Sequence, residues 1–511
     1  MQARVRGLPS TCWLAAETHH VRWPQPLRLP TLRNSVSHKV IRMRLVIATV
    51  LTILVASPAR AVQLDQETQT RVDAVFADYD RTTGPGCAVG IVQGGRLTFD
   101  RGYGMGSLDH AIALGSSSVF YLASVSKQFT AASVLIAAHE GHLSLDDDVR
   151  AHIPEMPAYG TVVTVRNLLH HTSGVRDYLS LMELAGIPFE NILSDEDMLD
   201  LIARQKELNF APGSEYLYSN SGYVLLAEIV KRTTGRSLRE YADEKIFGPL
   251  GMKDTHFHDD RTHIVRDRVF SYDEREGGGW ATNYLMNFDK VGDGGLYSTV
   301  EDLARWDSAF YGDALGIPNF AEQMYQRGVL TSGDTIDYAR GLGVSARRGL
   351  QRVAHGGGMM AFRTMLARYP DQRTTVITLC NVGSANSGAL SAAIEDIVLK
   401  GRFLENAPAS PAGPPSESVE DEHPTAPQTV LQSLAGTYVS GELGSTWILE
   451  AGDAELILTH PSGATLTLTM DGEDVFSHSG LTLSFERRGD QAVAFVLQAG
   501  RVRNLRFERV R

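Results

Sequence analysis

The order of strand-like and helix-like segments constrains the fold of this chain more than any other feature of its sequence. Helical patterns dominate from Ser124 to about Tyr311, several with capping patterns, and strand patterns lie on both sides of this region. The strand patterns fall at residues 87–92, 96–100, from 343 onward, 364–369 and 373–380. We therefore expect an α/β (α+β) fold, in which one antiparallel sheet is built from both ends, is flanked by helices and carries an inserted helical region.

Local signals add detail to this expectation. Gly94-Gly95 joins the first two strands as a hairpin, and residues 72–79 and 391–400 have helical patterns. Three pairs of residues with capping chemistry mark helix starts: Ser194 with Asp197, Ser237 with Glu240, and Thr299 with Asp302.

The C-terminal part of the chain has a different texture. Residues 405–428 are rich in Pro, Ala, Ser and Glu and predict a semi-flexible linker. Beyond them, short runs with frequent turn signals predict a small antiparallel β-barrel over residues 429–511. Its strand runs are 434–439, 446–449, 455–459, 465–470, 481–485, 492–497 and 502–507.

The N-terminal part has the features of an export signal. Met43-Arg44 is followed by the apolar run 45–55 and by Ala59-Arg60-Ala61, a pattern typical of a cleavage site. The apolar run is too short for a membrane span. We expect residues 1–61 to be an N-terminal extension with a signal peptide at 43–61, and the main domain to cover 62–404. The exported protein would be periplasmic or secreted, with no integral membrane span after cleavage.

Charge and cysteine content narrow the choice of partners. Residues 1–61 hold nine of the 48 basic and one of the 60 acidic residues, so the remaining chain has 39 basic and 59 acidic residues and a net charge of −20. Such an acidic protein is a poor nucleic-acid binder. Cys87 and Cys380 lie in apolar strand-like segments, where two buried, non-bonded residues are the default expectation and a disulfide stays open.

The stretch Ser124-Val125-Ser126-Lys127 carries the strongest chemical signal. Residues three apart on a helix share a face, so Lys127 can hydrogen-bond the Ser124 hydroxyl. A serine hydroxyl becomes a good nucleophile when a nearby base takes its proton. The positive start of a helix also suits a reaction that develops an oxyanion.

Two downstream segments are candidate partners. Tyr218-Ser219-Asn220 follows a Pro-Gly turn and precedes an apolar helical run that Asn220 or Ser221 can cap. His355-Gly356-Gly357-Gly358 lies among the second group of strands. Glycines there allow a substrate or another backbone to approach closely.

Together these motifs resemble the serine β-lactamase and penicillin-binding protein superfamily. The closer likeness is to its branch of class C β-lactamases, DD-carboxypeptidases, D-aminopeptidases and related esterases. It runs from about residue 64 to 401 and includes Leu168–Gly174, Pro249–Met252 and Gly294–Thr299. The C-terminal barrel resembles the lipocalin-like domains of some of these relatives.

The resemblance implies a role for each motif residue. Ser124 would be the acylated nucleophile, and Lys127 and Tyr218 the proton-handling pair. Asn220 would hydrogen-bond Lys127 and the substrate, and the backbone N–H groups of Ser124 and Gly358 would form the oxyanion hole. An ammonium near Tyr218 would lower the pKa of its phenol. Either Lys127 or Tyr218 could be the base.

Two groups of histidines need separate interpretation: one departs from the β-lactamase pattern, and the other raises the alternative of a metal site. His355 stands where β-lactamases have a lysine that faces the substrate carboxylate, and histidine is largely neutral at neutral pH. His355 with Gly357 therefore looks more like the His-x-Gly of D-aminopeptidases and some DD-peptidases. We expect His170 and His171 to serve packing and loop structure. The spacing of His256, His258, Asp259, Asp260 and His263 fits no standard zinc motif, so we expect a solvated loop there, with no metal and no cofactor.

These observations predict an exported serine hydrolase that acts through an acyl-enzyme on a small-molecule or peptide substrate. The scissile bond would be an amide or ester in compounds that contain D-amino acids or esters. A penicillin-binding sensor that acylates without turnover, or a true β-lactamase, stays open as an alternative. We also expect the barrel to limit access to the cleft; oligomeric state has no signature in the sequence.

Overall fold

The computed structural model describes residues 63–283, 288–404 and 426–510. The expected extension and signal peptide at 1–61 and most of the expected linker at 405–428 lie outside the described residues. No helix within the described ranges is long and apolar enough to cross a membrane.

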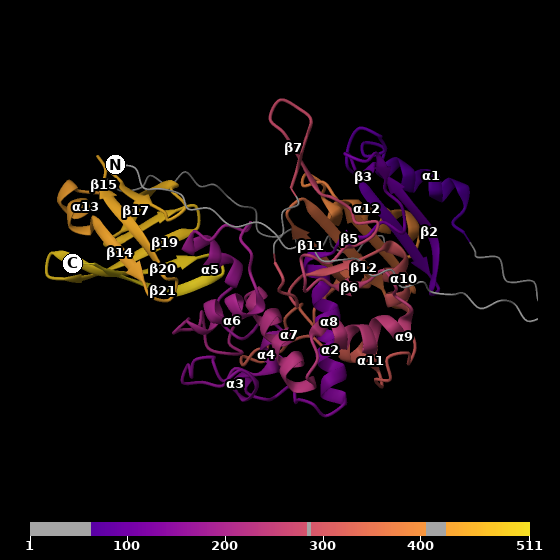
Figure 1. The fold of residues 1–511 in the computed structure, drawn as a ribbon, viewed down its shortest axis with the longest axis horizontal. Coiled ribbons are helices and arrows are strands. Elements are labelled where there is room, and N and C mark those ends of the chain that lie inside the picture. The colour runs from indigo at the N-terminus through magenta and orange to yellow at the C-terminus, as the bar shows by residue number, and fades with distance from the viewer. Residues whose placement is uncertain (1–62, 284–287, 405–425, 511) are drawn as a thin grey trace, which may run out of the picture. The chain divides into compact units, whose positions relative to one another are not determined.

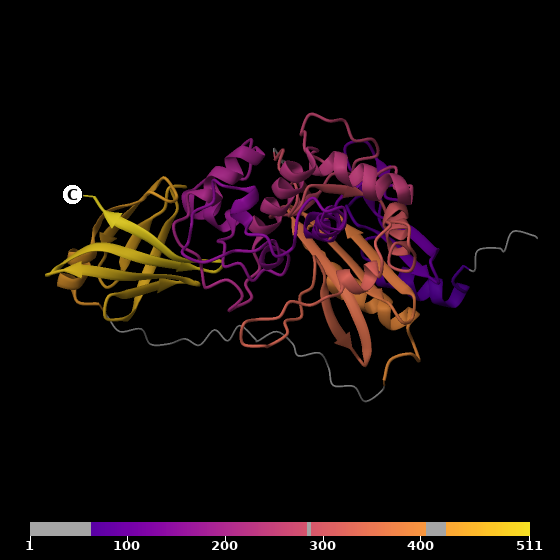
Figure 2. The same ribbon diagram turned by 90° about the horizontal axis from the view of Figure 1, so that it is seen from below.

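The main sheet is antiparallel and is built from both ends of its region, as predicted. Its strand order is β10-β11-β12-β13-β1-β2, so the late strand β13 pairs with the early strand β1 in the middle of the sheet (Figures 1 and 2). The strands are β1 Cys87–Gln93, β2 Arg96–Tyr103, β10 Gly343–Arg347, β11 Leu350–Met359, β12 Phe362–Tyr369 and β13 Thr374–Cys380.

Helices cover both faces of this sheet. Alternate residues of β1 point to opposite sides: Val89 and Ile91 pack with α1 (Gln66–Val75) and α12 (Ser387–Val398), whereas Ala88 and Val92 belong to the core on the side of α10 (Val300–Ser308). Gly90 allows α10 to lie close, because a Cβ at this position would come within 2.4 Å of Val300. Cover on both faces explains why the central strands β1 and β13 are buried along almost their whole length.

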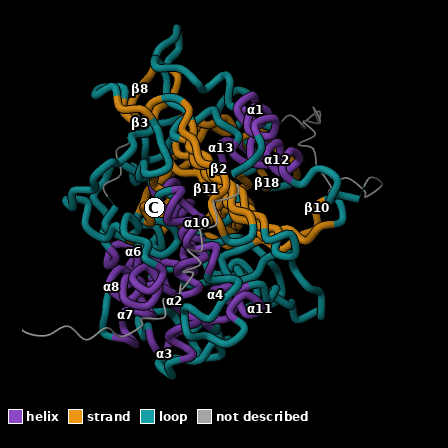
Figure 3. Tube along the Cα trace, turned by 90° about the vertical axis from the view of Figure 1, so that its right-hand side faces the viewer, coloured by secondary structure: helices purple, strands orange, loops and turns teal. Residues whose placement is uncertain are grey.

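The inserted helical region centres on α2, which packs against α7 and α8. Every residue of α2 except its last two is buried, so this helix forms the middle of the region rather than its surface. Figure 3 shows these helices in purple, gathered away from the strands of the sheet. The helices are α2 Lys127–His139, α3 Val149–His152, α4 Val165–Leu169, α5 Tyr178–Ala185, α6 Asp195–Ala203, α7 Asn220–Thr234, α8 Leu238–Ala242, the π-helical turn η2 Asp243–Phe247, α9 Gly248–Leu250 and α11 Phe320–Met324.

Short strands connect the sheet and the helices. In a three-stranded sheet of order β5-β9-β6, β5 (Phe120–Tyr121) pairs with β9 (Leu296–Ser298) and leads directly into the turn that carries Ser124. The remaining short strands are β3 Met105–Ser107, β4 Ile112–Ala113, β6 His256–Phe257, β7 Tyr272–Glu274 and β8 Trp280–Thr282.

Helix boundaries test the local predictions. Reciprocal capping boxes at Ser194 and Ser237, and the Thr299 cap of α10, confirm the three predicted helix starts. The expected cap at Asn220 or Ser221 is wrong, because Ser219 occupies the cap position and Asn220 is already helical. The first helix ends at Val75 and not at Tyr79.

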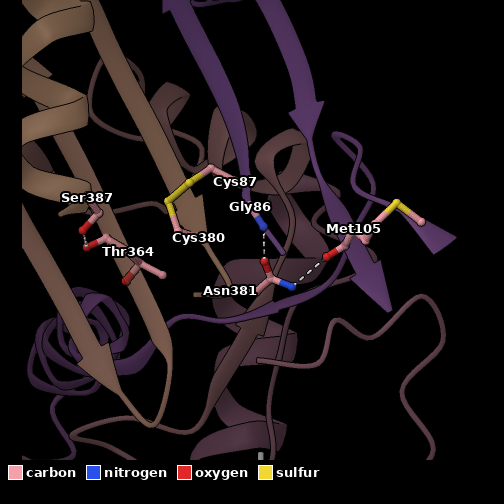
Figure 4. Close-up of a disulfide and its surroundings, with 7 residues drawn as sticks. All are labelled: Gly86, Cys87, Met105, Thr364, Cys380, Asn381 and Ser387. Atoms are coloured by element: carbon pink, nitrogen blue, oxygen red, sulfur yellow. Dashed lines mark hydrogen bonds between the residues drawn. A yellow bond between two sulfur atoms is a disulfide. The ribbon is translucent and has the colours of Figure 1, made fainter. Parts of the chain in front are cut away.

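Cys87 and Cys380 form a disulfide, so the default expectation of two non-bonded cysteines is wrong. The two residues face each other across the β1–β13 pair, which brings together positions 293 residues apart in sequence. Figure 4 shows the bond beside Asn381, whose amide accepts from Gly86 N–H and donates to Met105 O. The disulfide thus fastens the two halves of the sheet at their junction.

The C-terminal region closes into an eight-stranded antiparallel barrel, β14–β21, drawn in orange to yellow in Figure 1. Its interior holds stacked and tilted aromatic rings, including Trp447, Phe495 and Phe507. Seven strands match the predicted runs and the eighth, β18, was not predicted. The elements are the helix α13 Gln428–Leu434 and strands β14 Gly436–Ser440, β15 Ser445–Ala451, β16 Leu456–Thr459, β17 Thr465–Gly472, β18 Val475–His478, β19 Leu481–Arg488, β20 Gln491–Ala499 and β21 Val502–Arg509.

Buried polar contacts join the barrel to the helical region. Arg176 is fully buried, and its guanidinium pairs with Glu442 at 2.7 Å and donates to the carbonyls of Arg503 and Asn504. The indole N–H of Trp447 donates to Leu184 O. The buried Arg176–Glu442 pair therefore ties the segment between β14 and β15 to the start of α5.

Candidate active site

Ser124 lies on a tight turn between strand and helix. After β5, the 3₁₀ turn η1 (Ala123–Ser126) runs directly into α2, so the predicted helix from Ser124 is a 3₁₀ turn that continues as an α-helix. Ala123 has a positive φ of 50°, which turns the backbone sharply just before Ser124. The expected contact is present: Lys127 Nζ donates to Ser124 Oγ at 3.2 Å.

The Lys127 ammonium is held by three acceptors. Besides Ser124, its Nζ donates to Asn220 Oδ1 at 2.8 Å and to the backbone oxygen of Asp293 at 2.6 Å. The side chain is fully buried. Burial lowers the pKa of Lys127 to about 8, although the carboxylates of Asp293 and Asp177 act in the opposite direction. A fixed amine with such a pKa can accept the proton of the neighbouring hydroxyl.

Asn220 is oriented by a carboxylate that the sequence analysis did not single out. Asp177 Oδ2 accepts from the backbone N–H of Asn220 at 2.6 Å and from its Nδ2 at 2.8 Å. This fixes the amide with its oxygen toward Lys127. Asp177 also caps α5 through the N–H of Ser180. An aspartate beginning a helix after Arg176 was a capping signal, but its pairing with α7 depends on tertiary structure.

Tyr218 lies beside the same ammonium. Its ring centroid is 4.9 Å from Lys127 Nζ, and the phenol interacts with the Ser124 hydroxyl. Burial nevertheless raises the pKa of Tyr218 above its ordinary value, and the hydrogen bond with Ser124 only partly opposes this. The expectation of a phenol pKa below its ordinary value is therefore wrong. At neutral pH Tyr218 is a proton donor, which favours Lys127 as the base.

His171 supports Tyr218 from behind, consistent with the packing role expected of it. The two rings have centroids 4.1 Å apart, and Nδ1 of His171 accepts from the N–H of Ser219 at 3.1 Å. Burial and the charge of Lys127 lower the pKa of His171 well below its usual value, so it is neutral. A neutral ring fixes the Tyr218 loop without adding a charge.

His355 lines the pocket as a neutral ring. Its Nδ1 lies 2.6 Å from Gly356 O, and a carbonyl only accepts, so Nδ1 carries the proton. Its Nε2 then accepts from the hydroxyl of Tyr338 at 3.1 Å. Burial, followed by the charge of Lys127, lowers the pKa of His355 to about 4. His355 therefore supplies no positive charge for a substrate carboxylate.

The glycines after His355 have different surroundings. Gly356 and Gly358 line the pocket, whereas Gly357 is packed against the nucleophile turn. A Cβ on Gly357 would come within 2.3 Å of Leu122 O, and one on Gly358 would meet its nearest neighbour at 3.9 Å. The prediction of a substrate contact thus has geometric support at Gly358, and at Gly357 the structure places a close backbone contact instead.

A buried charged group beneath Lys127 was not predicted. Asp293 accepts from Lys290 Nζ at 2.5 Å and from the Tyr178 hydroxyl at 3.0 Å, while its backbone oxygen holds Lys127. Burial favours the neutral acid, but Lys290 and Lys127 outweigh it and lower the pKa of Asp293. The only sequence hint was its place just before the matched segment Gly294–Thr299. The negative charge of Asp293 therefore offsets the positive charge of one of the two buried lysines, Lys127 and Lys290.

These groups surround a pocket of about 340 Å³. Its wall is formed by residues of the Ser124 turn, Tyr218, Asn220, the segment around Asp293 and strand β11. Arg501, from the turn between β20 and β21 of the barrel, completes it. The four sequence-predicted residues Ser124, Lys127, Tyr218 and Asn220 thus lie together. His355 lines the same pocket, with its ring centroid 6.2 Å from that of Tyr218.

The second histidine group lies elsewhere. His256 and His258 are partly or fully buried against Tyr297, at ring centroid distances of 5.8 and 4.9 Å, so the expected solvated loop is wrong for them. Burial lowers the pKa of His256 to about 3 and of His258 to about 4. Within the described part of the chain, no group of three or more His, Cys, Asp or Glu side chains is arranged to hold a metal ion.

The antiparallel sheet, the inserted helices and the serine–lysine pair define a protein with the β-lactamase fold. A family model described as Beta-lactamase matches residues 72–398, and the chain belongs to this family. Penicillin-binding protein 4* of Bacillus subtilis (strain 168) is 33% identical over 307 residues, which are 57% of this chain and 66% of that protein. A D-aminopeptidase of Cereibacter sphaeroides (strain ATCC 17023) is 30% identical over 328 residues, 62% of this chain and 61% of that protein.

The chain thus spans about three fifths to two thirds of these curated relatives. Among solved structures, the octameric penicillin-binding protein homologue from Pyrococcus abyssi has a TM-score of 0.58 at 20% identity, over 86% of this chain and 99% of that one. The D-amino acid amidase from Ochrobactrum anthropi SV3, complexed with L-phenylalanine amide, has a TM-score of 0.56 at 18% identity, over 66% and 99%. These structural likenesses support the fold.

Proposed function

We propose that the chain is an exported serine hydrolase that forms an acyl-enzyme at Ser124 and cleaves amide or ester bonds of small compounds, among them D-amino-acid-containing peptides and esters. One observation carries the proposal: a buried lysine with a pKa of about 8 donates to the hydroxyl of a serine that lines a pocket. An amine of this kind is the base that a serine nucleophile needs.

In the proposed reaction, neutral Lys127 takes the proton of Ser124 as Oγ bonds to the substrate carbonyl carbon. The oxyanion is stabilised by the backbone N–H groups of Ser124 and Gly358. When the bond to the leaving amine or alcohol breaks, Tyr218 gives that group its proton and Lys127 returns a proton to Tyr218. A water molecule then attacks the acyl carbon, and the same side chains move the protons in the reverse order. The bond to Ser124 Oγ breaks, the acid is released, and Ser124 regains its hydrogen.

The relatives support the substrate class and the disulfide supports export. Of the two curated relatives, the first is named a penicillin-binding protein and the second a D-aminopeptidase. Disulfides persist mainly in oxidising compartments, and Cys87–Cys380 is consistent with passage out of the cytoplasm. A non-turnover penicillin-binding sensor or a true β-lactamase is the second candidate, favoured by the first relative's name.

The test replaces Ser124 with alanine and uses Ser308 as the matched control, since its exposed hydroxyl donates to the backbone oxygen of Arg305, away from the pocket. We expect Ser124→Ala to lower hydrolysis of p-nitrophenyl esters and D-aminoacyl amides by at least about 10³-fold, and Ser308→Ala to leave it unchanged. Equal activity of wild type and Ser124→Ala would refute the mechanism.

Intact mass spectrometry separates the two candidates. After mixing with substrate or a chromogenic cephalosporin, a hydrolase shows an adduct on the wild type that disappears within turnover time. A sensor keeps that adduct for hours. A persistent adduct with every substrate class would replace the hydrolase proposal by the sensor.

A further inference from the structure

A cation from the barrel reaches the catalytic pocket. Arg501 lies in the turn between β20 and β21 and lines the same pocket as Ser124 and Tyr218. Its guanidinium carbon is 4.9 Å from the centroid of the Tyr218 ring. The turn is held in place, because the backbone oxygen of Arg501 accepts from Asn209 Nδ2 at 2.9 Å and from Asp177 N–H at 3.4 Å.

The other basic groups of the pocket are already engaged. Lys127 is bound to three acceptors, and Lys290 is buried in its pair with Asp293. His355 is neutral, and both its nitrogens have partners. None of these three groups can turn toward a ligand without giving up a close internal contact.

Arg501 differs from these three groups, because its internal contact is longer and its side chain is more exposed. Its ion pair with Asp177 is long, at 3.9 Å, and its side chain is 44% exposed. Asp177 is meanwhile occupied by shorter bonds to Asn220. A guanidinium in this position can approach an entering carboxylate with two parallel N–H donors, which lysine cannot do.

We propose that Arg501 binds a carboxylate of the substrate, so that the barrel domain supplies the anion recognition that His355 does not. Since the guanidinium lies over Tyr218, the proton donor to the leaving group, the carboxylate belongs to the leaving half of the substrate. The preferred substrates are then peptides with a free C-terminal carboxylate next to the scissile bond. This rests on the proposed acyl-enzyme at Ser124 and specifies its substrate class.

The test measures binding with the nucleophile removed, so that turnover does not enter. Titration calorimetry compares N-acetyl-D-alanyl-D-alanine with its C-terminal amide on Ser124→Ala protein. We expect the acid to bind about 10- to 100-fold more tightly than the amide, the range of a charge-assisted hydrogen bond. Adding Arg501→Gln should abolish this preference, and Arg501→Lys should restore only part of it.

Arg503→Gln is the matched control, because Arg503 is a second barrel arginine at the interface and pairs with exposed Glu215. It should leave the acid preference unchanged, and thermal unfolding should show that each variant is folded. The proposal is overturned if acid and amide bind equally, if neither binds at millimolar concentration, or if both arginine variants lose the preference equally. Persistence of ester hydrolysis in Ser124→Ala would instead overturn the proposed function, while an Arg501-dependent preference would still stand.

Discussion

The pKa of Lys127 sets the pH dependence expected of the enzyme. Burial brings this pKa from 10.5 to about 8. The difference of about 2.5 pH units corresponds to about 3 kcal/mol. At pH 7 about 10% of Lys127 is then the neutral base, against about 0.03% for a lysine in water, a gain of about 300-fold.

The direction of the pH dependence follows from which protonation state of Lys127 reacts. Neutral Lys127 accumulates as pH rises through its pKa, so kcat/KM should rise about tenfold between pH 6 and 7 and level off above pH 8. The assay follows p-nitrophenyl butyrate hydrolysis from pH 6 to 9.5, corrected for spontaneous cleavage. Tyr218→Phe should lower the plateau and keep the midpoint. A flat profile, or a midpoint that disappears with Tyr218, would refute Lys127 as the base.

Two charge-removing variants sharpen this prediction, because they should move the midpoint in opposite directions. The carboxylate of Asp177 favours the ammonium form of Lys127, so Asp177→Asn should lower the pKa of Lys127 and shift the rise of kcat/KM to lower pH. The guanidinium of Arg501 disfavours the ammonium form, so Arg501→Gln should shift this rise to higher pH. Shifts in the same direction would show that the rise of kcat/KM does not report the titration of Lys127.

Two further predictions concern stability. Replacing both Cys87 and Cys380 by serine should lower the free energy of unfolding by about 2–5 kcal/mol, since the bond closes a very long loop; equal urea midpoints for wild type and variant would contradict this. Gly357→Ala should cost about 1–3 kcal/mol, because its Cβ would press on Leu122 O, whereas Gly358→Ala should unfold in urea as the wild type does.

Local chemistry made much of the fold predictable. The hairpin at Gly94-Gly95, strands β12 and β13 and the capping boxes at Ser194 and Ser237 each depend on a few neighbouring residues. The sheet built from both ends followed from the order of these segments. Strand β18 was missed because its four residues, Val475–His478, mix apolar and polar side chains with too short a pattern.

The parts of the site that were missed depend on contacts between distant segments. Asp177 reaches Asn220, and Arg501 reaches Tyr218, only through the packing of separate elements. The disulfide likewise required the register of β1 against β13. The pKa of Tyr218 was predicted in the wrong direction because proximity to an ammonium is visible in a motif, whereas burial is not.

Adjacent residues Arg176 and Asp177 connect the barrel to the catalytic groups. Arg176 is buried against Glu442 and the carbonyls of Arg503 and Asn504, while Asp177 holds Asn220, which holds Lys127. Removing the barrel would take away Glu442 and the two carbonyl groups that hold the Arg176 guanidinium, immediately beside this chain of hydrogen bonds.

Truncation would therefore disturb the base as well as the entrance to the pocket, and lost activity would not show that the barrel limits access. A substitution at the tip of the barrel turn leaves the Arg176 contacts in place and changes one charge at the pocket wall. Arg501 is for this reason the position at which the barrel's contribution to substrate selection can be measured separately from its contribution to folding.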